Sequence, residues 1–142
     1  MGIMIDKGAL SGLVHWPLVI AEHLTRDLRR LYEPAFRRAG IKERHFRALF
    51  AVSEGALNQT RFADALGVSQ NATTSLVDTL ERKGWLQRIV NRHNRREKFV
   101  ELTPKGRAVM ERSMRVLASS ARTELPESTR VAIEKLSKLI EN

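Results

Sequence analysis

Residues 58–69 read Asn-Gln-Thr-Arg-Phe-Ala-Asp-Ala-Leu-Gly-Val-Ser, and this run carries the signals of a helix, a tight turn and a second helix. Asn58 is a preferred helix N-cap residue, Gly67 supplies the turn, and the second helix opens at Ser69. Apolar residues recur at the spacing of one helical face, and we expect burial at Phe62, Ala63, Leu66, Val68 and Leu76. The pattern predicts a helix-turn-helix.

The second predicted helix presents a row of short polar side chains. These are Ser69, Gln70, Asn71, Thr74 and Ser75. Such a row on the N-terminal half of a helix suits the edges of bases in a DNA major groove, where each base pair shows a distinct pattern of donors and acceptors. The alternative is an ordinary solvated helix face, since this periodicity also occurs in helical hairpins.

Two short segments rich in β-branched and aromatic residues follow the glycine at position 84. They are residues 85–90 and 97–103, and they are expected to be strands. A polar turn with arginines at its tip, residues 91–96, lies between them. A helix-turn-helix followed by a hairpin with a cationic tip predicts a winged helix.

The order of residues across this region resembles the signature of the multiple antibiotic resistance regulator (MarR) family of bacterial transcription regulators. The matching positions are Leu76-Val77-Asp78, Leu80-Glu81, Lys83-Gly84, Arg88, Arg95-Arg96, Val100, Leu102-Thr103 and Gly106. The resemblance is strong over residues 58–106 and weak from residue 18 to the C-terminus. It implies a mainly α fold with a small β-hairpin, in which a winged helix-turn-helix is flanked by N- and C-terminal dimerisation helices. The chain departs from the family at Asn94, where the family usually has an aspartate that would pair with the wing arginines.

Positive charge is concentrated on the predicted wing. The net charge is +9, and residues 82–98 contain seven basic side chains against one acid. Such an excess favours a polyanion, and its place on a hairpin rather than on an amphipathic helix favours nucleic acid over a membrane surface. By its position in the family motif, Arg96 is expected in the minor groove, with Arg92 and Arg95 beside it at the wing tip. Phosphate contacts are expected from Arg82, Arg88 and Lys98. The alternative is that the arginines belong to a solvated loop.

Long helices are expected at both ends of the chain. The first begins near Trp16 or Pro17, and Pro34 is expected to kink or end it, with helical residues persisting to Ala39. A long helix begins at Pro104 and stops at Pro126, and a last one starts near residue 127.

The 142 residues predict a single domain, with a winged helix-turn-helix over 41–103 and a helical dimerisation region over 13–39 and 104–142. A winged helix is too small to cover the apolar faces of these end helices. They pack as a bundle within one chain or interlock with a second copy, and we expect a homodimer.

The sequence lacks the residues that several classes of function require. The chain has no cysteine, its four histidines do not form an i, i+4 pair, and it has no phosphate-binding glycine motif or nucleophile elbow. We therefore expect no enzyme, no cofactor and no metal site. The absence of a long apolar run and of an export signal predicts no membrane association and a cytoplasmic protein.

The resemblance implies an effector site where the first two helices meet the winged helix. Cationic and aromatic candidates on these helices are His23, Arg26, His45, Phe46 and Phe50. The mixture suits an aromatic carboxylate or a phenol, but core aromatics with surface cations would give the same pattern.

Together these features predict a regulator that binds double-stranded DNA sequence-specifically. We expect a homodimeric repressor on a pseudo-palindromic operator, released by a small aromatic anionic effector. The alternative is a winged-helix protein that binds DNA or RNA architecturally, without sequence preference.

Overall fold

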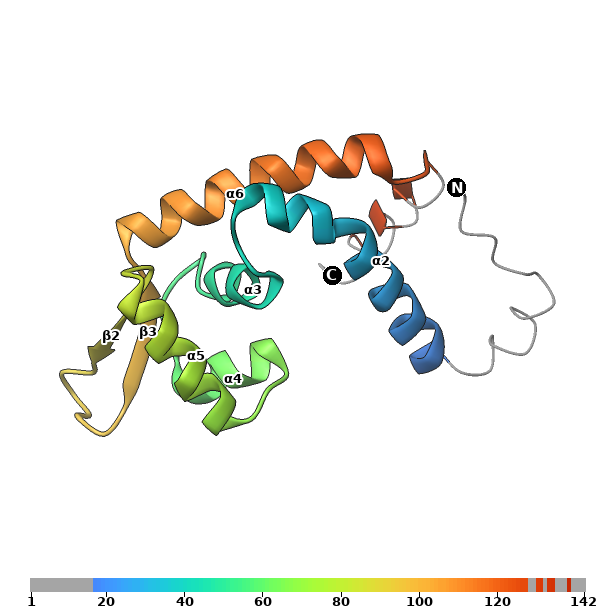
Figure 1. Cartoon of the computed structure of the whole chain (residues 1–142). Helices are drawn as coiled ribbons and strands as arrows, with labels where there is room; N and C mark the ends of the chain where they lie inside the picture. The colour runs from blue at the N-terminus through green and yellow to red at the C-terminus, as the bar shows by residue number, and fades with distance from the viewer. Residues whose placement is uncertain (1–16, 128–129, 132, 135–137, 139–142) are drawn as a thin grey trace. The chain divides into compact units, whose positions relative to one another are not determined.

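The computed structural model describes residues 17–127, 130, 131, 133, 134 and 138 (Figure 1). It divides into two compact units, one formed by residues 36–116 and the other by the described residues up to 35 and from 117 onward. Its elements in chain order are α2 (Pro17–Ala39), α3 (Glu43–Ala51), β1 (Leu57–Asn58), α4 (Gln59–Leu66), α5 (Gln70–Arg82), β2 (Leu86–Val90), β3 (Lys98–Leu102) and α6 (Pro104–Glu124). The fold is therefore mainly helical with a small sheet, as the sequence predicts.

The sheet has three antiparallel strands in the order β1-β3-β2. The predicted hairpin is present as β2 and β3, in which Arg88 lies opposite Val100. A third strand, β1, was not expected from the sequence; its Asn58 pairs with Phe99 on the other side of β3. The residue that caps α4 thus also belongs to the sheet that carries the wing.

The core of the unit formed by residues 36–116 lies between α3, α4, α5 and the sheet. Its largest fully buried apolar side chains include Phe62, Leu49, Leu80 and Leu86. These come from all four components, so their burial fixes the helices against the strands. The predicted burial of Val68 is wrong: its side chain is 41% exposed in the turn between α4 and α5.

Local capping interactions determine where α4 and α5 begin and end. The Asn58 Oδ1 atom accepts a hydrogen bond from the Arg61 backbone N–H at 2.9 Å, and the Ser69 Oγ atom accepts one from Ala72 at 3.2 Å. Gly67 and Gly84 have φ values of +65° and +72°, which favour glycine because it lacks a Cβ atom. The helix-turn-helix predicted from these four residues is confirmed.

The long helices begin as predicted. The Thr103 Oγ1 atom caps α6 by accepting from the Gly106 N–H at 3.0 Å, and α6 ends at Glu124 before Pro126. Helix α2 begins at Pro17 and continues through Pro34 to Ala39, so this proline does not end it. The final predicted helix lies largely outside the described residues.

Candidate nucleic-acid interface

Helix α5 turns one apolar face to the core and leaves a polar row outside. Thr73, Val77 and Leu80 are buried. Gln70, Asn71 and other members of the row are exposed. The Ser69 hydroxyl serves as the helix cap, so this member of the predicted DNA-contacting set also has a structural task. The others, Gln70, Asn71, Thr74 and Ser75, are presented together on one side of α5.

Two members of the row are held by the first turn of α4. The Gln59 Nε2 atom donates to Thr74 Oγ1 at 2.8 Å, and the Gln70 Nε2 atom donates to Thr60 Oγ1 at 3.5 Å. Gln59 and Thr60 were missed by sequence reasoning, although both are polar residues directly after the Asn58 cap. Their contacts join the polar row of α5 to α4.

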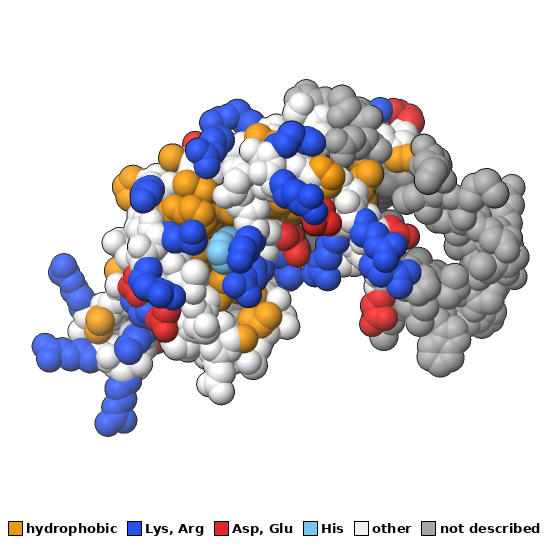
Figure 2. Space-filling view, in the orientation of Figure 1, with side chains coloured by type: hydrophobic (Ala, Val, Ile, Leu, Met, Phe, Trp, Pro, Cys, Tyr) orange, Lys and Arg blue, Asp and Glu red, His pale blue; other side chains and the backbone are white. Residues whose placement is uncertain are grey.

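The wing places its cations outside the sheet. Arg92, Arg95, Arg96 and Lys98 are all exposed. Figure 2 shows lysine and arginine side chains projecting from the end of the molecule where Figure 1 places the β2–β3 hairpin. These four predicted nucleic-acid contacts therefore share one exposed element.

Asparagine side chains and backbone bonds order the wing turn. The Asn94 Oδ1 atom accepts from the Arg96 N–H at 3.2 Å, and the Asn94 backbone oxygen accepts from the Glu97 N–H at 2.9 Å. The Asn91 Oδ1 atom accepts from the His93 N–H at 2.9 Å. Asn94 thus holds the turn through its amide oxygen, a task that a neutral side chain can perform.

Arg88 is placed differently from the wing arginines. Its guanidinium forms ion pairs with Asp78, at 2.7 Å, and with Glu81, and its backbone N–H donates to the same Glu81 carboxylate at 3.2 Å. Two carboxylates on α5 thereby neutralise it. This arrangement argues against the phosphate contact predicted for Arg88 and gives it the role of joining α5 to β2.

Arg82 keeps the position expected of a phosphate contact at the end of α5. Its side chain is exposed, and its described contacts are to its own helix, with the Asp78 carbonyl oxygen at 3.4 Å and the Thr79 hydroxyl at 3.5 Å. The charge is not balanced by these neutral groups, so it remains available to an anion.

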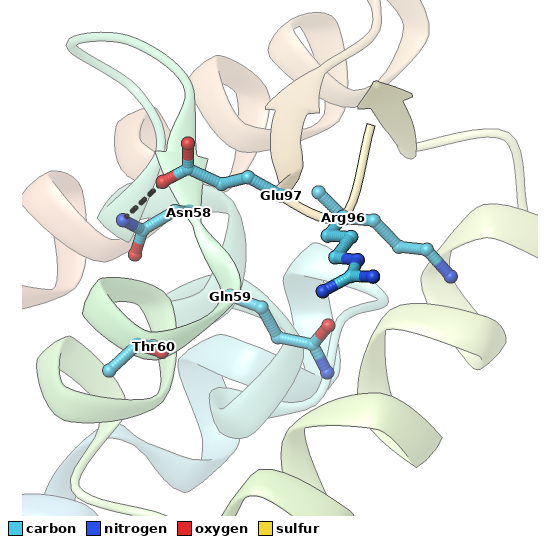
Figure 3. A pocket seen from close by; sticks show the side chains of 6 residues that line it. Asn58, Gln59, Thr60, Arg96 and Glu97 are labelled. Carbon is cyan, nitrogen blue, oxygen red and sulfur yellow. Dashed lines mark hydrogen bonds between the residues drawn. The ribbon is translucent and has the colours of Figure 1, made fainter. Parts of the chain in front are cut away.

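A pocket of about 360 Å³ separates the start of α4 from the wing. It is lined by Asn58, Gln59, Thr60, Arg96, Glu97 and Lys98. Figure 3 shows the Gln59 and Arg96 side chains extending into the same region, while the Asn58 amide reaches the Glu97 carboxylate. The wing and the helix-turn-helix therefore form adjacent walls of one polar, cation-bearing surface.

Two of the five predicted effector residues contact each other. On α3, the Phe46 and Phe50 rings stack with centroids 6.1 Å apart, and Phe50 is 54% exposed. Arg26 is exposed on the other unit, and the His23 side chain lies outside the described residues. The set of five thus stays a prediction.

His45 has a different ring contact. It is buried on α3, and its ring and that of Trp85 are in a T-shaped arrangement with centroids 6.3 Å apart. Burial lowers the pKa of His45 from 6.5 to about 4, with a further contribution from the nearby cations Arg44, Lys42 and Lys83. Its Nε2 atom has no hydrogen-bond partner among the described residues. His45 is thus a neutral core ring.

The described part of the chain lacks two other classes of site. No cluster of three or more histidine, cysteine, aspartate or glutamate side chains there could hold a metal ion. No helix there has the length and apolar character needed to cross a membrane.

The residues of the candidate interface lie in the part of the chain that matches a known protein family. The model of the MarR family matches residues 39–97. The multiple antibiotic resistance protein MarR of Salmonella typhimurium is 35% identical over 57 residues, which are 40% of this chain and 40% of that protein. The match therefore spans about two fifths of the length of that relative.

Solved structures extend the likeness over the remaining helices. The transcriptional regulator BldR from Sulfolobus solfataricus is 28% identical with a TM-score of 0.72, and the alignment covers 93% of this chain and 96% of BldR. The chain is therefore similar to MarR family regulators, in sequence over residues 39–97 and in fold over most of its length. A mutant of Escherichia coli MarR, solved in complex with operator DNA, shares the MarR fold with a TM-score of 0.68 at 23% identity, covering 90% of this chain and 96% of that one. The proteins matched here are transcription regulators, which agrees with the prediction that the chain is not an enzyme.

Proposed function

We propose that this chain is a MarR family regulator that binds double-stranded DNA and reads its sequence with α5. The observation that carries the proposal is a surface that links α5 to the wing: Gln59 bonds Thr74 of the polar row and lines one pocket with Arg96 and Lys98. Arg92 and Arg95 are exposed on the same wing. Amide and hydroxyl groups recognise base edges, whereas arginine and lysine bind phosphates or a narrow minor groove. The two kinds of group are thus separated between the two elements that a winged helix offers to DNA.

The polar row favours sequence reading over architectural coating of DNA or RNA. A coating protein needs cations along a surface, and the exposed α5 positions Gln70, Asn71 and Ser75 carry no charge. The bridges from Gln59 to Thr74 and from Gln70 to Thr60 orient part of the row. Oriented donors and acceptors discriminate between bases, while a mobile cation does not.

We further propose that the regulator acts in the cytoplasm as a homodimer on a pseudo-palindrome. One α5 reads a single half-site, and two copies related by a two-fold axis read both. Occupancy of a promoter would then repress it by excluding polymerase. The terminal segments 13–39 and 104–142 are the proposed dimerisation region.

Release by a small aromatic anion is proposed for the same dimer. Such an effector would act only if it bound better to the form in which the two copies of α5 are wrongly spaced for DNA. The exposed Phe50 beside Phe46 supports an aromatic ligand on α3.

A selection experiment separates sequence reading from coating. Purified protein is mixed with genomic fragments of its source, bound fragments are recovered, and one enriched fragment competes with bulk genomic DNA at fixed salt. We expect an enriched palindromic motif and a preference of at least about 10³-fold over bulk DNA. A preference near one would instead establish the architectural alternative.

A further inference from the structure

We propose that Glu97 is a positioning residue that fixes the wing against the helix-turn-helix before DNA is bound. This inference rests on the proposed function, because it concerns how the DNA-reading surface is held together. Neither the family motif nor the predicted contact set includes Glu97. It is the one acid among the seven basic residues of segment 82–98.

Both oxygens of the Glu97 carboxylate are engaged, and by different elements. Its Oε1 atom accepts from Asn58 Nδ2 at 3.2 Å (Figure 3), and its Oε2 atom accepts from Asn91 Nδ2 at 3.0 Å. Asn58 is the cap of α4, and Asn91 is the first residue after β2. The carboxylate therefore joins the helix-turn-helix to both strands of the hairpin, since Glu97 itself directly precedes β3.

Both polar atoms of the Asn58 side-chain amide take part in this arrangement. Its Oδ1 atom caps α4 through the Arg61 N–H, and this contact orients its Nδ2 atom toward Glu97. A backbone hydrogen bond reinforces the contact between Asn91 and Glu97, because the Asn91 N–H donates to the Glu97 backbone carbonyl oxygen at 3.2 Å. We call the three side chains of Asn58, Glu97 and Asn91 the wing brace.

Electrostatics alone would not favour a carboxylate here. Glu97 lies between Arg96 and Lys98 on a wing proposed to approach phosphates, and a negative charge weakens that attraction. A glutamine at the same position would strengthen the attraction between the wing and the phosphates. The carboxylate is nevertheless suited to two donors at once, which a glutamine with a single amide oxygen is not.

The brace places a negative charge on a wing turn that is otherwise without one. Asn94 supplies no negative charge to the wing. Glu97 supplies a carboxylate three residues later and directs it inward to Asn58 and Asn91. The wing of this chain is thus ordered by an acid at its base.

Three variants test the brace at controlled charge. Asn58→Asp keeps a good helix cap but sets two carboxylates against each other, and Glu97→Gln leaves one of the two asparagine amides facing a donor. The double variant Asn58→Asp with Glu97→Gln restores both contacts: donor and acceptor are exchanged between residues 58 and 97, while the Asn91 amide still donates to residue 97. It has the net charge of the natural chain. Glu101→Gln, which removes an acid of β3 that is bonded to Gln87 of β2, is the matched control for charge.

Hydrogen exchange in the DNA-free, full-length protein is the deciding measurement. We expect the backbone amides of Asn91, Asn94 and Glu97 to exchange about fivefold faster in both single variants and at the original rate in the double variant. Glu101→Gln should leave them unchanged. Original rates in Glu97→Gln, or no recovery in the double variant, would overturn the brace.

Binding to a selected fragment and to a shuffled one completes the test. We expect Glu97→Gln to lose several-fold in the ratio of the two affinities and the double variant to recover it. Equal strengthening on both fragments with unchanged exchange rates would mean that Glu97 acts through charge alone, which also overturns the proposal. If the natural chain itself shows no preference, the proposed function fails, while the exchange rates still decide on the brace.

Discussion

Burial of His45 couples one side chain to the pH dependence of folding. Its pKa is lowered to about 4 in the folded chain, chiefly by burial, whereas an unfolded chain takes up the proton near 6.5. The unfolded state therefore binds more protons between these values, and stability present above pH 6.5 is lost as the pH falls toward 4.

We predict that this single group lowers the free energy of unfolding by about 2 kcal/mol between pH 8 and pH 5. His45→Phe keeps an aromatic ring beside Trp85 and cannot be protonated, so its stability should fall less over that range. Urea unfolding of both proteins at the two pH values measures the difference. Parallel losses in the two proteins would show that His45 does not contribute.

The exposed Arg96 is expected to act on DNA through its charge. Arg96→Ala should weaken binding to selected and shuffled fragments alike and reduce the slope of log affinity against log salt by about one. Arg115→Ala, which removes the same charge from an exposed position of α6, is the matched control. A salt slope that does not change would remove Arg96 from the set of contacts.

At the scale of elements, α6 meets the start of β2 without room for a side chain. A Cβ atom added to Gly106 would lie 1.9 Å from the Trp85 backbone oxygen, which also accepts the Thr103 N–H at 3.1 Å. The Thr103 hydroxyl donates to the Gly84 oxygen at 2.6 Å. One close contact thus joins α5, the wing and α6.

Gly106→Ala should destabilise the chain by about 1–3 kcal/mol, because backbone atoms must move to admit the methyl group. Helix propensity alone gives the opposite sign, since alanine is better than glycine inside a helix by about 1 kcal/mol. Chemical denaturation therefore separates the two effects. A variant more stable than the natural chain would contradict the contact.

The elements that the sequence predicted correctly have local signals at their ends. Asn58 and Ser69 cap helices through residues three positions away, and Gly67 and Gly84 have the backbone conformation that glycine favours. The strand β1 was missed because two residues carry no period and its partner, Phe99, is 41 positions along the chain.

Exposure could be predicted from the sequence, and Asn71 and Arg96 are exposed as their positions indicate. Ion-pair partners could not: the charge of Arg88 is balanced by Asp78 and Glu81, which weakens the predicted phosphate contact and which a count of basic residues does not reveal. Glu97 was overlooked for the same reason, because its partners Asn58 and Asn91 are set by the fold.

For the whole molecule, the proposed dimer is the arrangement that makes two half-site readers into one regulator. Sedimentation equilibrium of the full chain at micromolar concentration should give twice the chain mass of 16.2 kDa. The value should be insensitive to moderate salt if apolar faces of the terminal helices form the interface. A monomer mass under these conditions would refute dimerisation through the ends.

Base reading by α5 is the central claim, and the ratio of affinities for a selected fragment and a shuffled one at fixed salt tests it most directly. Asn71 is exposed on α5 and carries no charge, so Asn71→Ala should lower this ratio about tenfold or more while affinity for the shuffled fragment changes little. An equal loss on both fragments, or an unchanged ratio for both Asn71→Ala and Gln70→Ala, would contradict it.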